Sequence, residues 1–375
     1  MPLFSENLTG IRAPEFPEGL TWLNSPALTM RQLQQSRNVV LIDFWTYSCV
    51  NCIRTLPYLF AWHERYRDYG LVIIGIHSPE FDFERCVTNV EHALEEFSIT
   101  YPIVVDSNRA VWQRWENHVW PRKLIVNYRG KVVYDHSGEG GYAKTEHAIR
   151  KALRAAGAKN LPPPTDNAPD LHASGAVCYP TTPETYLGYA RGRIGNAHGY
   201  YRGRREHYQD TGRSEPHAWF LRGGWIAEPE YVHHADRTHS QEYDGYVRLN
   251  YEALAVNVVA GVEPLNANYA SLAPFPKAPA VGATFLAKAL EEPQLQKPTE
   301  ARVRVEFNGE PVPGGMRGHD IREENGRTYI LVTRYRMYSV ISSRRFHKGT
   351  LKLIVNSDNI RFYTFTFSGC EGVEV

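Results

Sequence analysis

The sequence predicts two domains of different fold class, an α/β domain followed by an all-β domain, and three observations predict this. Apolar runs alternate with segments of helical spacing over residues 39–156, which is typical of a sheet covered by helices. A proline-rich stretch at 161–170 indicates a stiff linker. Beyond it strand-like runs recur, and no long amphipathic helix is evident. We therefore expect an α/β domain over residues 1–160 and a β domain over 171–375, which suits a chain of 375 residues.

Residues that start or stop helices mark the elements of the first domain. Thr29 is a good helix N-cap, and Gly70 and Gly157 each end a helical segment. Arg129 and Gly130 turn a hairpin. In chain order, the expected elements are a strand at 20–24, a helix at 29–35, a strand at 39–44, a helix at 52–69, a strand at 71–77, a crossover helix at 83–97, a strand at 101–106, a helix at 109–116, hairpin strands at 124–128 and 131–135, and a helix at 143–156.

The second domain is expected to be an antiparallel sandwich, specifically a jelly roll, because its strand candidates are rich in β-branched and aromatic residues. The stretch 362–367, Phe-Tyr-Thr-Phe-Thr-Phe, is the plainest example. A Pro/Ala-rich stretch at 273–280 indicates an insertion loop. The strand candidates are 217–221, 246–259, 301–307, 328–335, 351–356 and 360–367.

Two cysteines, Cys49 and Cys52, follow the strand at 39–44 where a helix begins. The unpaired N–H groups and the positive end of a helix stabilise a thiolate, so we expect Cys49 to be a nucleophile. Cys52 is one helical turn further on and near enough to close a disulfide with Cys49. This spacing is typical of redox-active dithiols.

Asp43 lies shortly before these cysteines in an otherwise apolar strand. A buried carboxylate is costly, so we expect Asp43 to have a function, namely to accept or return the proton of the Cys52 thiol. The alternative is an aspartate at a strand end that faces water.

The other three cysteines, Cys86, Cys178 and Cys370, are scattered singly, so a zinc site built on the CxxC pair lacks its remaining ligands. An odd total of five cysteines argues against a framework of structural disulfides. Cys178 and Cys370 lie near the two ends of the β domain, and a disulfide between them is a secondary alternative. Cys86, on the expected crossover helix, is predicted to be a small buried apolar residue.

Four stretches together resemble one known family. Residues 43–59, DFWTYSCVNCIRTLPYL, are similar to the redox centre of DipZ-type thiol–disulfide exchange proteins, which are relatives of the TlpA and ResA reductases. His-Ser-Pro-Glu-Phe at 77–81 and Trp-Pro at 120–121 resemble the same family. Residues 183–191, PETYLGYAR, resemble the start of its second, carbohydrate-binding-module-like domain.

This resemblance implies a thioredoxin fold with a cis-proline that faces the dithiol. Pro121 takes that role, and the backbone of Trp120 is expected to pair with the substrate chain. The resemblance also places a set of side chains on the substrate side of the site. Two of them, His77 and Glu80, are expected to border the redox cleft and modulate the thiols, or alternatively only to shape the loop. This set is Trp45, Tyr47, Trp120, His77 and Glu80.

The residues and the resemblance together predict a protein-disulfide oxidoreductase. Cys49 attacks a substrate disulfide, Cys52 resolves the mixed disulfide with help from Asp43, and the Cys49–Cys52 pair needs no other cofactor. Val50 and Asn51 lack the histidine of strongly oxidising motifs, which favours a reductant fed by a separate dithiol donor. Its expected partners are disulfide-bearing proteins or small thiols.

Two other functions stay open. The Thr46-x-x-Cys49 spacing is similar to that of thiol peroxidases, although the upstream proline expected there is missing. Alternatively, the β domain is the main actor, as a sugar- or partner-binding module with an accessory redox domain. Aromatic and arginine residues in 189–208 could then stack on sugars, while a net charge of +1 argues against nucleic acid as the partner.

Two further patterns are weaker. His217, His233, His234 and His239 could hold a metal, but they lack partners of known spacing. Gly138-Glu-Gly-Gly141 lacks the spacing and the lysine of a phosphate loop.

The chain has neither a signal-peptide pattern at its start nor an apolar run long enough to span a bilayer. This favours a cytoplasmic location, whereas the family resemblance suggests one outside the cytoplasm.

Overall fold

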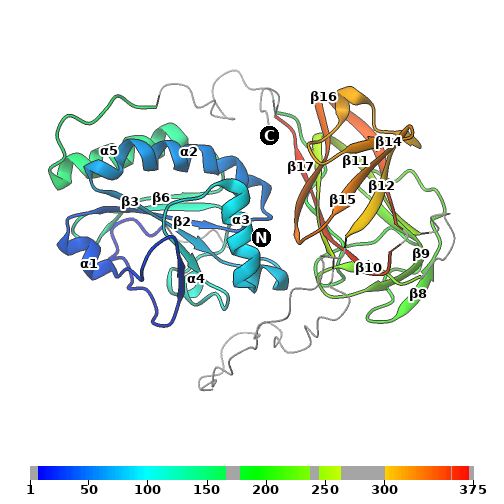
Figure 1. Ribbon diagram of the computed structural model, residues 1–375, viewed down its shortest axis with the longest axis horizontal. Coiled ribbons are helices and arrows are strands. Elements are labelled where there is room, and N and C mark those ends of the chain that lie inside the picture. Colours follow the sequence, from blue (N-terminus) through cyan, green and yellow to red (C-terminus); the bar gives the residue numbers. More distant parts are fainter. Residues whose placement is uncertain (1–6, 166–177, 237–244, 263–299, 356, 371–375) are drawn as a thin grey trace. The chain divides into compact units, whose positions relative to one another are not determined.

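The structure is a computed structural model, and it describes residues 7–165, 178–236, 245–262, 300–355 and 357–370 (Figure 1). The chain divides into two compact units, Met1–Tyr179 with Cys370–Val375, called here the α/β unit, and Pro180–Gly369, called here the β unit. No helix in these described ranges is long and apolar enough to cross a bilayer. The linker residues 166–170, the loop expected at 273–280, and His239 lie outside the described residues.

The α/β unit alternates strands and helices largely as expected. Its elements are β1 (Thr21–Leu23), α1 (Met30–Gln35), β2 (Val39–Trp45), α2 (Val50–Tyr66), β3 (Leu71–His77), α3 (Val87–Phe97), β4 (Ile103–Val105), α4 (Ala110–Arg114), β5 (Arg122–Val126), β6 (Val132–Ser137) and α5 (Tyr142–Ala156), with 3₁₀ turns at Arg67–Tyr69 and Asp82–Arg85.

One mixed sheet, in the order β1-β4-β3-β2-β5-β6, forms the middle layer of this unit. The strands β2, β3 and β4 are parallel, whereas β5 and β6 form an antiparallel hairpin next to β2. Side chains of β2 alternate between two cores, since Leu41 packs with α2, α3 and α5 and Ile42 packs with α1 and α4. Figure 1 shows α2 and α5 on one face of the sheet and α1 on the other. This is the predicted thioredoxin-like arrangement.

Local sequence signals fix several of the boundaries. Thr29 caps α1 through a capping box with Gln32. Gly70 adopts a left-handed conformation, with φ 94°, directly before β3.

The crossover helix is shorter than predicted, because Cys86 is extended and α3 begins only at Val87. The preceding turn is held by the Glu84 carboxylate, which accepts the backbone N–H groups of Glu80 and Phe81. Cys86 is therefore a half-buried N-cap residue and not a buried residue of a helix, which corrects the prediction.

The β unit is one large antiparallel sheet in the described residues. Its strands are β7 (Thr185–Tyr186), β8 (Arg205–Tyr208), β9 (Trp219–Ala227), β10 (Val232–His234), β11 (Gly245–Val262), β12 (Ala301–Phe307), β13 (Glu310–Pro311), β14 (Arg322–Glu324), β15 (Arg327–Val332), β16 (Arg336–Val355) and β17 (Ile360–Ser368). The main path is β14-β15-β12-β16-β11-β17-β10-β9-β8.

The long strand β11 is the centre of this sheet. It pairs with β16 along most of its length, while its two halves pair with β9 and β17 on the other side. Four strands form a closed ring by pairing, because β11 pairs with β9, β9 with β10, β10 with β17, and β17 again with β11. An antiparallel β fold is confirmed.

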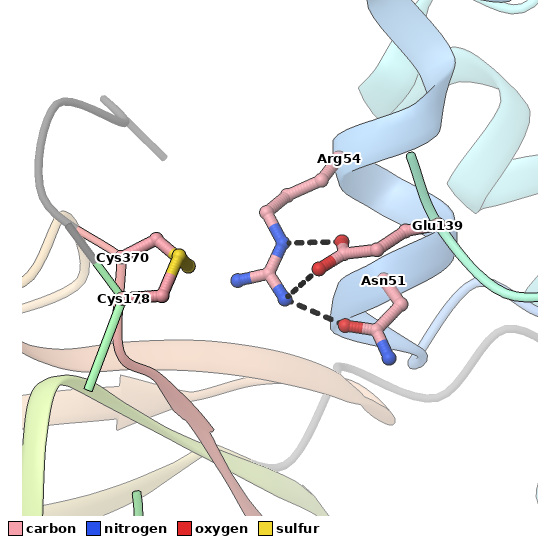
Figure 2. Close-up of a disulfide and its surroundings, with 5 residues drawn as sticks. All are labelled: Asn51, Arg54, Glu139, Cys178 and Cys370. Atoms are coloured by element: carbon pink, nitrogen blue, oxygen red, sulfur yellow. Dashed lines mark hydrogen bonds and ion pairs between the residues drawn. A yellow bond between two sulfur atoms is a disulfide. The ribbon is translucent and has the colours of Figure 1, made fainter. Parts of the chain in front are cut away.

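A disulfide between Cys178 and Cys370 joins the two segments that flank the β unit. Figure 2 shows the bond between the two sulfur atoms. The prediction against structural disulfides, which rested on the odd number of cysteines, was wrong. The five cysteines comprise the pair Cys49 and Cys52, the disulfide Cys178–Cys370, and the single thiol Cys86.

Candidate active site

The predicted dithiol lies at the junction of β2 and α2. Cys49 is the N-cap residue of α2, in an extended conformation, and its Sγ accepts the backbone N–H of Cys52 at 3.3 Å. This is the geometry that stabilises a thiolate at a helix N-terminus. Cys49 is half-buried, whereas Cys52 is only 1% exposed. The more exposed member of the pair is thus the one predicted to attack.

Asp43 is buried on β2, with its Oδ1 atom unpartnered. Burial raises the pKa of its carboxyl from 3.8 to about 7, and the charge of Lys123 opposes this rise. Asp43 does not face water, so the alternative of a solvent-facing aspartate is wrong. A carboxyl with a pKa near neutral pH is suited to proton transfer.

Cys52 and Tyr101 share the buried surroundings of Asp43. The pKa of the Cys52 thiol lies well above its ordinary value because of burial first, then a hydrogen bond and the charge of Cys49, with a smaller contribution from Asp43. Burial, Asp43 and Cys52 likewise raise the pKa of Tyr101. Asp43, Cys52 and Tyr101 therefore interact electrostatically within one buried region, and the proton-transfer role of Asp43 stays a prediction.

Pro121 follows a cis peptide bond from Trp120, as the resemblance implied. The Trp120 indole Nε1 donates to the Ser78 carbonyl at 3.0 Å, and its ring lies 4.3 Å from that of Trp112. Trp120 is half-buried, so part of this side chain is accessible beside the proline.

His77 lies inside the protein, with no exposed surface. Its ring stacks on Tyr47 at 5.3 Å, meets Trp45 edge-on, and places Nε2 3.3 Å from Thr46 Oγ1. Burial lowers the pKa of His77 to about 3, so the ring is neutral at physiological pH.

The assignment of Trp45, Tyr47 and His77 to substrate contact stays a prediction, and their burial does not support it. Their rings pack against one another in the interior, and Trp45 and Tyr47 are close in sequence to Cys49. Glu80 is half-buried, and its backbone N–H donates to Glu84.

Sequence reasoning missed Glu84, which has no exposed surface. Its Oε1 accepts the Ser48 hydroxyl at 2.6 Å, and its Oε2 accepts the N–H groups of Glu80 and Phe81 at 2.6 and 3.1 Å. Glu84 thus ties the residue before Cys49 to the loop after β3. The available signal was the alternation of acidic and aromatic residues in Phe-Asp-Phe-Glu at 81–84.

The weaker metal site is not assembled in the described residues. His217 Nδ1 lies 2.8 Å from Thr182 Oγ1, and His233 and His234 are successive residues of β10 that point to opposite faces. No group of three or more histidine, cysteine or acidic side chains that could hold a metal occurs within the described ranges.

Two of the arginines of 189–208 lie over aromatic rings of the same stretch. The Arg202 guanidinium is 5.1 Å from the centre of the Tyr189 ring, and that of Arg204 is 5.0 Å from that of Tyr201. Each pair occupies ring surface that a sugar would need for stacking.

The chain is similar to known proteins over most of its length. A family model described as Redoxin matches residues 9–153, and one described as Thioredoxin like C-terminal domain matches 182–272 and 278–368. Protein DipZ of Mycobacterium tuberculosis is 35% identical over 253 residues, which is 66% of this chain and 35% of DipZ. The chain thus spans about a third of the length of the DipZ proteins it matches.

Two further relatives match shorter stretches of the chain. Thiol-disulfide oxidoreductase YkuV of Bacillus subtilis is 27% identical over 140 residues, covering 37% of this chain and 93% of YkuV. Human NHL repeat-containing protein 2 is 40% identical over 131 residues, which is 35% of this chain and 18% of that protein. Among solved structures, one titled as a putative thiol:disulfide interchange protein DsbE from Chlorobium tepidum has a TM-score of 0.35 at 18% identity, covering 39% of this chain and 97% of its own.

The α/β unit has a thioredoxin-like fold with a CxxC dithiol, and the chain is similar to proteins named as thiol-disulfide oxidoreductases. The two domain matches and the similarity to DipZ support a DipZ/ResA-type thioredoxin-like protein.

Proposed function

We propose that the chain reduces disulfides in proteins or small thiol compounds through Cys49 and Cys52. The observation that supports this most is the position of Cys49, half-buried at the N-terminus of α2 with its sulfur accepting the Cys52 N–H. The thiolate is the attacking form in disulfide exchange, and this position stabilises it. The cysteine pair is itself the redox group, so the reaction needs no further cofactor.

The reaction proceeds in two exchanges. The Cys49 thiolate attacks one sulfur of the substrate disulfide, forms a mixed disulfide and releases the first substrate thiolate. Cys52 then attacks the Cys49 sulfur, closes the Cys49–Cys52 disulfide and releases the second thiolate. Two electrons pass to the substrate, and the two released thiolates each take up a proton. The dithiol is oxidised and one substrate disulfide is reduced.

The surroundings of Cys52 favour this order of events. A hydrogen bond and the charge of Cys49 both help to raise the pKa of the Cys52 thiol. Once Cys49 is part of a mixed disulfide its sulfur carries no charge, so these two causes disappear. Asp43, with a pKa of about 7, can then accept the proton of Cys52 at neutral pH.

A separate dithiol protein is proposed to return the electrons. The same exchange in reverse regenerates Cys49 and Cys52, with the donor becoming a disulfide.

The Cys178–Cys370 disulfide favours the alternative of a location outside the cytoplasm over the cytoplasmic expectation. Structural disulfides persist mainly in oxidising compartments. A reductant in such a compartment depends on a dedicated supply of electrons, which agrees with a separate donor. The chain can be taken directly from cells and its free thiols alkylated before and after reduction. If Cys178 and Cys370 react only after reduction, the disulfide is present in the cell, and if they react before reduction, it is absent.

The jelly-roll arrangement and carbohydrate binding of the β unit stay proposals that rest on the family resemblance. Binding of glycans by residues 171–375 alone is the test of the second. Saturable binding supports it, whereas no binding leaves the β unit as a packing or docking domain.

Trapping of mixed disulfides tests the redox proposal. We expect Cys52→Ser to accumulate a mixed disulfide with a substrate, and Cys49→Ser to form none and to lose disulfide reductase activity. Cys86→Ser is the matched control, since Cys86 is also a free thiol of the α/β unit. Full activity of Cys49→Ser would overturn the mechanism. Hydrogen peroxide consumption that survives Cys52→Ser would favour the peroxidase instead.

A further inference from the structure

The loop at residues 138–141, Gly-Glu-Gly-Gly, connects β6 to α5 and contacts the proline side of the site. The Gly138 N–H donates to the Pro121 carbonyl at 2.8 Å, and Lys123 Nζ donates to the Gly138 carbonyl at 3.0 Å. Lys123 is the residue paired with Asp43 on the neighbouring strand. One residue of this loop therefore contacts both the cis-proline and the lysine that acts on Asp43.

The next residue of the loop, Glu139, reaches the helix that carries the dithiol (Figure 2). Arg54 Nε lies 2.9 Å from Glu139 Oε2, and Arg54 Nη2 lies 3.3 Å from Glu139 Oε1. The same Nη2 donates to Asn51 Oδ1 at 2.6 Å. Asn51 is one of the two residues between Cys49 and Cys52. The Glu139 carboxylate is thus linked to Asn51, in the CxxC turn, through the Arg54 side chain that contacts both.

A second route joins the same two segments. The Tyr142 hydroxyl, directly after the loop, lies 3.3 Å from Thr55 Oγ1, which donates to the Asn51 carbonyl at 2.9 Å. Both the side chain and the carbonyl of Asn51 are therefore held by contacts that lead to the loop at 138–141 or to the residue after it. The position of the CxxC turn is fixed against the rest of the site by these contacts.

The ion pair between Arg54 and Glu139 is shielded from water. The two side chains are only 11% and 19% exposed. Charges in such surroundings are screened less than surface charges, so they act on a nearby thiolate more strongly. Arg54 favours negative charge in the first turns of α2, whereas Glu139 opposes it.

We propose that Glu139 and Arg54 are positioning residues that set the equilibrium between the dithiol and disulfide forms of Cys49–Cys52. This rests on the proposed function. Reduction of the pair creates thiol groups, of which Cys49 is the thiolate-forming one, so the balance of the two charges decides how far the reduced form is favoured. Glu139 reduces the effect of the arginine, and Arg54 also holds Asn51 in place.

The test is the equilibrium with glutathione, in which the protein disulfide and two glutathione molecules give the protein dithiol and one glutathione disulfide. Glu139→Gln removes the opposing charge, and we expect it to shift the equilibrium constant toward the dithiol by about three- to tenfold. Arg54→Gln removes the favourable charge, and we expect a shift of similar size toward the disulfide. These shifts correspond to about 15–30 mV in opposite directions.

The matched control is Glu64→Gln on the same helix. Glu64 pairs with Arg67 at 2.9 Å, but both side chains are at least half exposed, so the equilibrium should stay at the wild-type value. Glu139→Asp keeps the charge and should also stay near it. Thermal unfolding shows whether each variant is folded. Glu139→Gln and Arg54→Gln each test the proposal independently of the other.

Shifts in the same direction, or wild-type constants in both variants, would overturn the proposal while leaving the redox function intact. A purely structural role would lower the unfolding temperature without this pair of opposite shifts. If the wild-type chain forms no Cys49–Cys52 disulfide in any glutathione buffer, the proposed function itself fails and this inference fails with it.

Discussion

Asp43 and Lys123 lie opposite each other on the neighbouring strands β2 and β5, and both are buried. Burial raises the pKa of Asp43 to about 7, while the positive charge of Lys123 acts in the opposite direction. The site therefore holds a carboxyl that can carry or release a proton at neutral pH and whose charge acts on the buried thiol of Cys52. Two predictions follow from this pair, one for stability and one for the reaction.

Asp43→Asn should make stability less dependent on pH. The pKa of Asp43 is raised from 3.8 to about 7 in the folded state, so the folded chain binds this proton more tightly than the unfolded chain does. The resulting stability is full below about pH 4 and is lost as the pH rises through about 7. Wild type should thus lose up to about 4 kcal/mol across this range that the variant does not lose.

Urea unfolding of wild type and Asp43→Asn at pH 4.5 and pH 8 measures this difference. The variant should be relatively more stable at pH 8 and slower in disulfide reduction at pH 7. Asp68→Asn, at an exposed aspartate, is the control and should follow wild type. A parallel pH dependence in wild type and Asp43→Asn would exclude the raised pKa.

Lys123→Met should move the pH dependence of the resolving step upward. The charge of Lys123 lowers the pKa of Asp43, so its removal raises that pKa further above 7. Stopped-flow measurement of the decay of a mixed disulfide on Cys49, as a function of pH, gives the midpoint directly. A midpoint that stays in place or moves downward would show that Lys123 does not act on Asp43.

Glu84→Ala should destabilise the α/β unit and the loop before Cys49. The variant leaves the Ser48 hydroxyl and the N–H groups of Glu80 and Phe81 without this acceptor. An unsatisfied buried donor costs about 1–3 kcal/mol, so we expect a loss of about 3 kcal/mol or more in the free energy of unfolding.

Glu84→Gln keeps one acceptor oxygen and should lose less than the alanine variant. Glu91→Ala, at an exposed position of α3, should be neutral within about 0.5 kcal/mol. Equal effects of the alanine and glutamine variants would contradict the proposed role of the carboxylate as acceptor.

Removal of the Cys178–Cys370 disulfide should destabilise the β unit. The bond closes a loop with a sequence separation of 192 residues, and the entropy of the unfolded chain makes such a long closure strongly stabilising. We expect Cys178→Ser with Cys370→Ser to lower the free energy of unfolding by about 2–5 kcal/mol. Dithiothreitol should lower the unfolding temperature of wild type but not of the double variant, and equal sensitivity would contradict the prediction.

Much of the α/β unit could be predicted because its signals are local. The apolar run of β2, the left-handed Gly70 and the hairpin turn at Gly130 each specify their own conformation. The position of Cys49 and Cys52 at a strand–helix junction follows from the same signals, which is why the dithiol was predictable.

The remaining site residues depend on contacts between distant segments. Lys123 acts on Asp43 only through the register of β5 against β2, and Tyr101 joins Cys52 through packing alone. No sequence pattern predicts that Lys123 lies opposite Asp43 or that Tyr101 packs in the same core as Cys52.

The first part of β16 was missed for another physical reason. The missed part includes the middle of the strand, residues 342–348, Ser-Ser-Arg-Arg-Phe-His-Lys, which is polar and largely exposed or half-exposed. Only its ends, Ser342 and His347–Lys348, are in register with β11, with a register shift between them.

The Cys178–Cys370 bond also changes how the polypeptide responds to proteolysis. A single cut of the backbone anywhere between Pro180 and Gly369 yields two fragments that stay covalently linked through these sulfurs. Such a nicked chain would migrate at full mass on a non-reducing gel and separate into two pieces only after reduction. The β unit is in this respect a closed covalent ring, with the α/β unit attached at the point where the ring is joined.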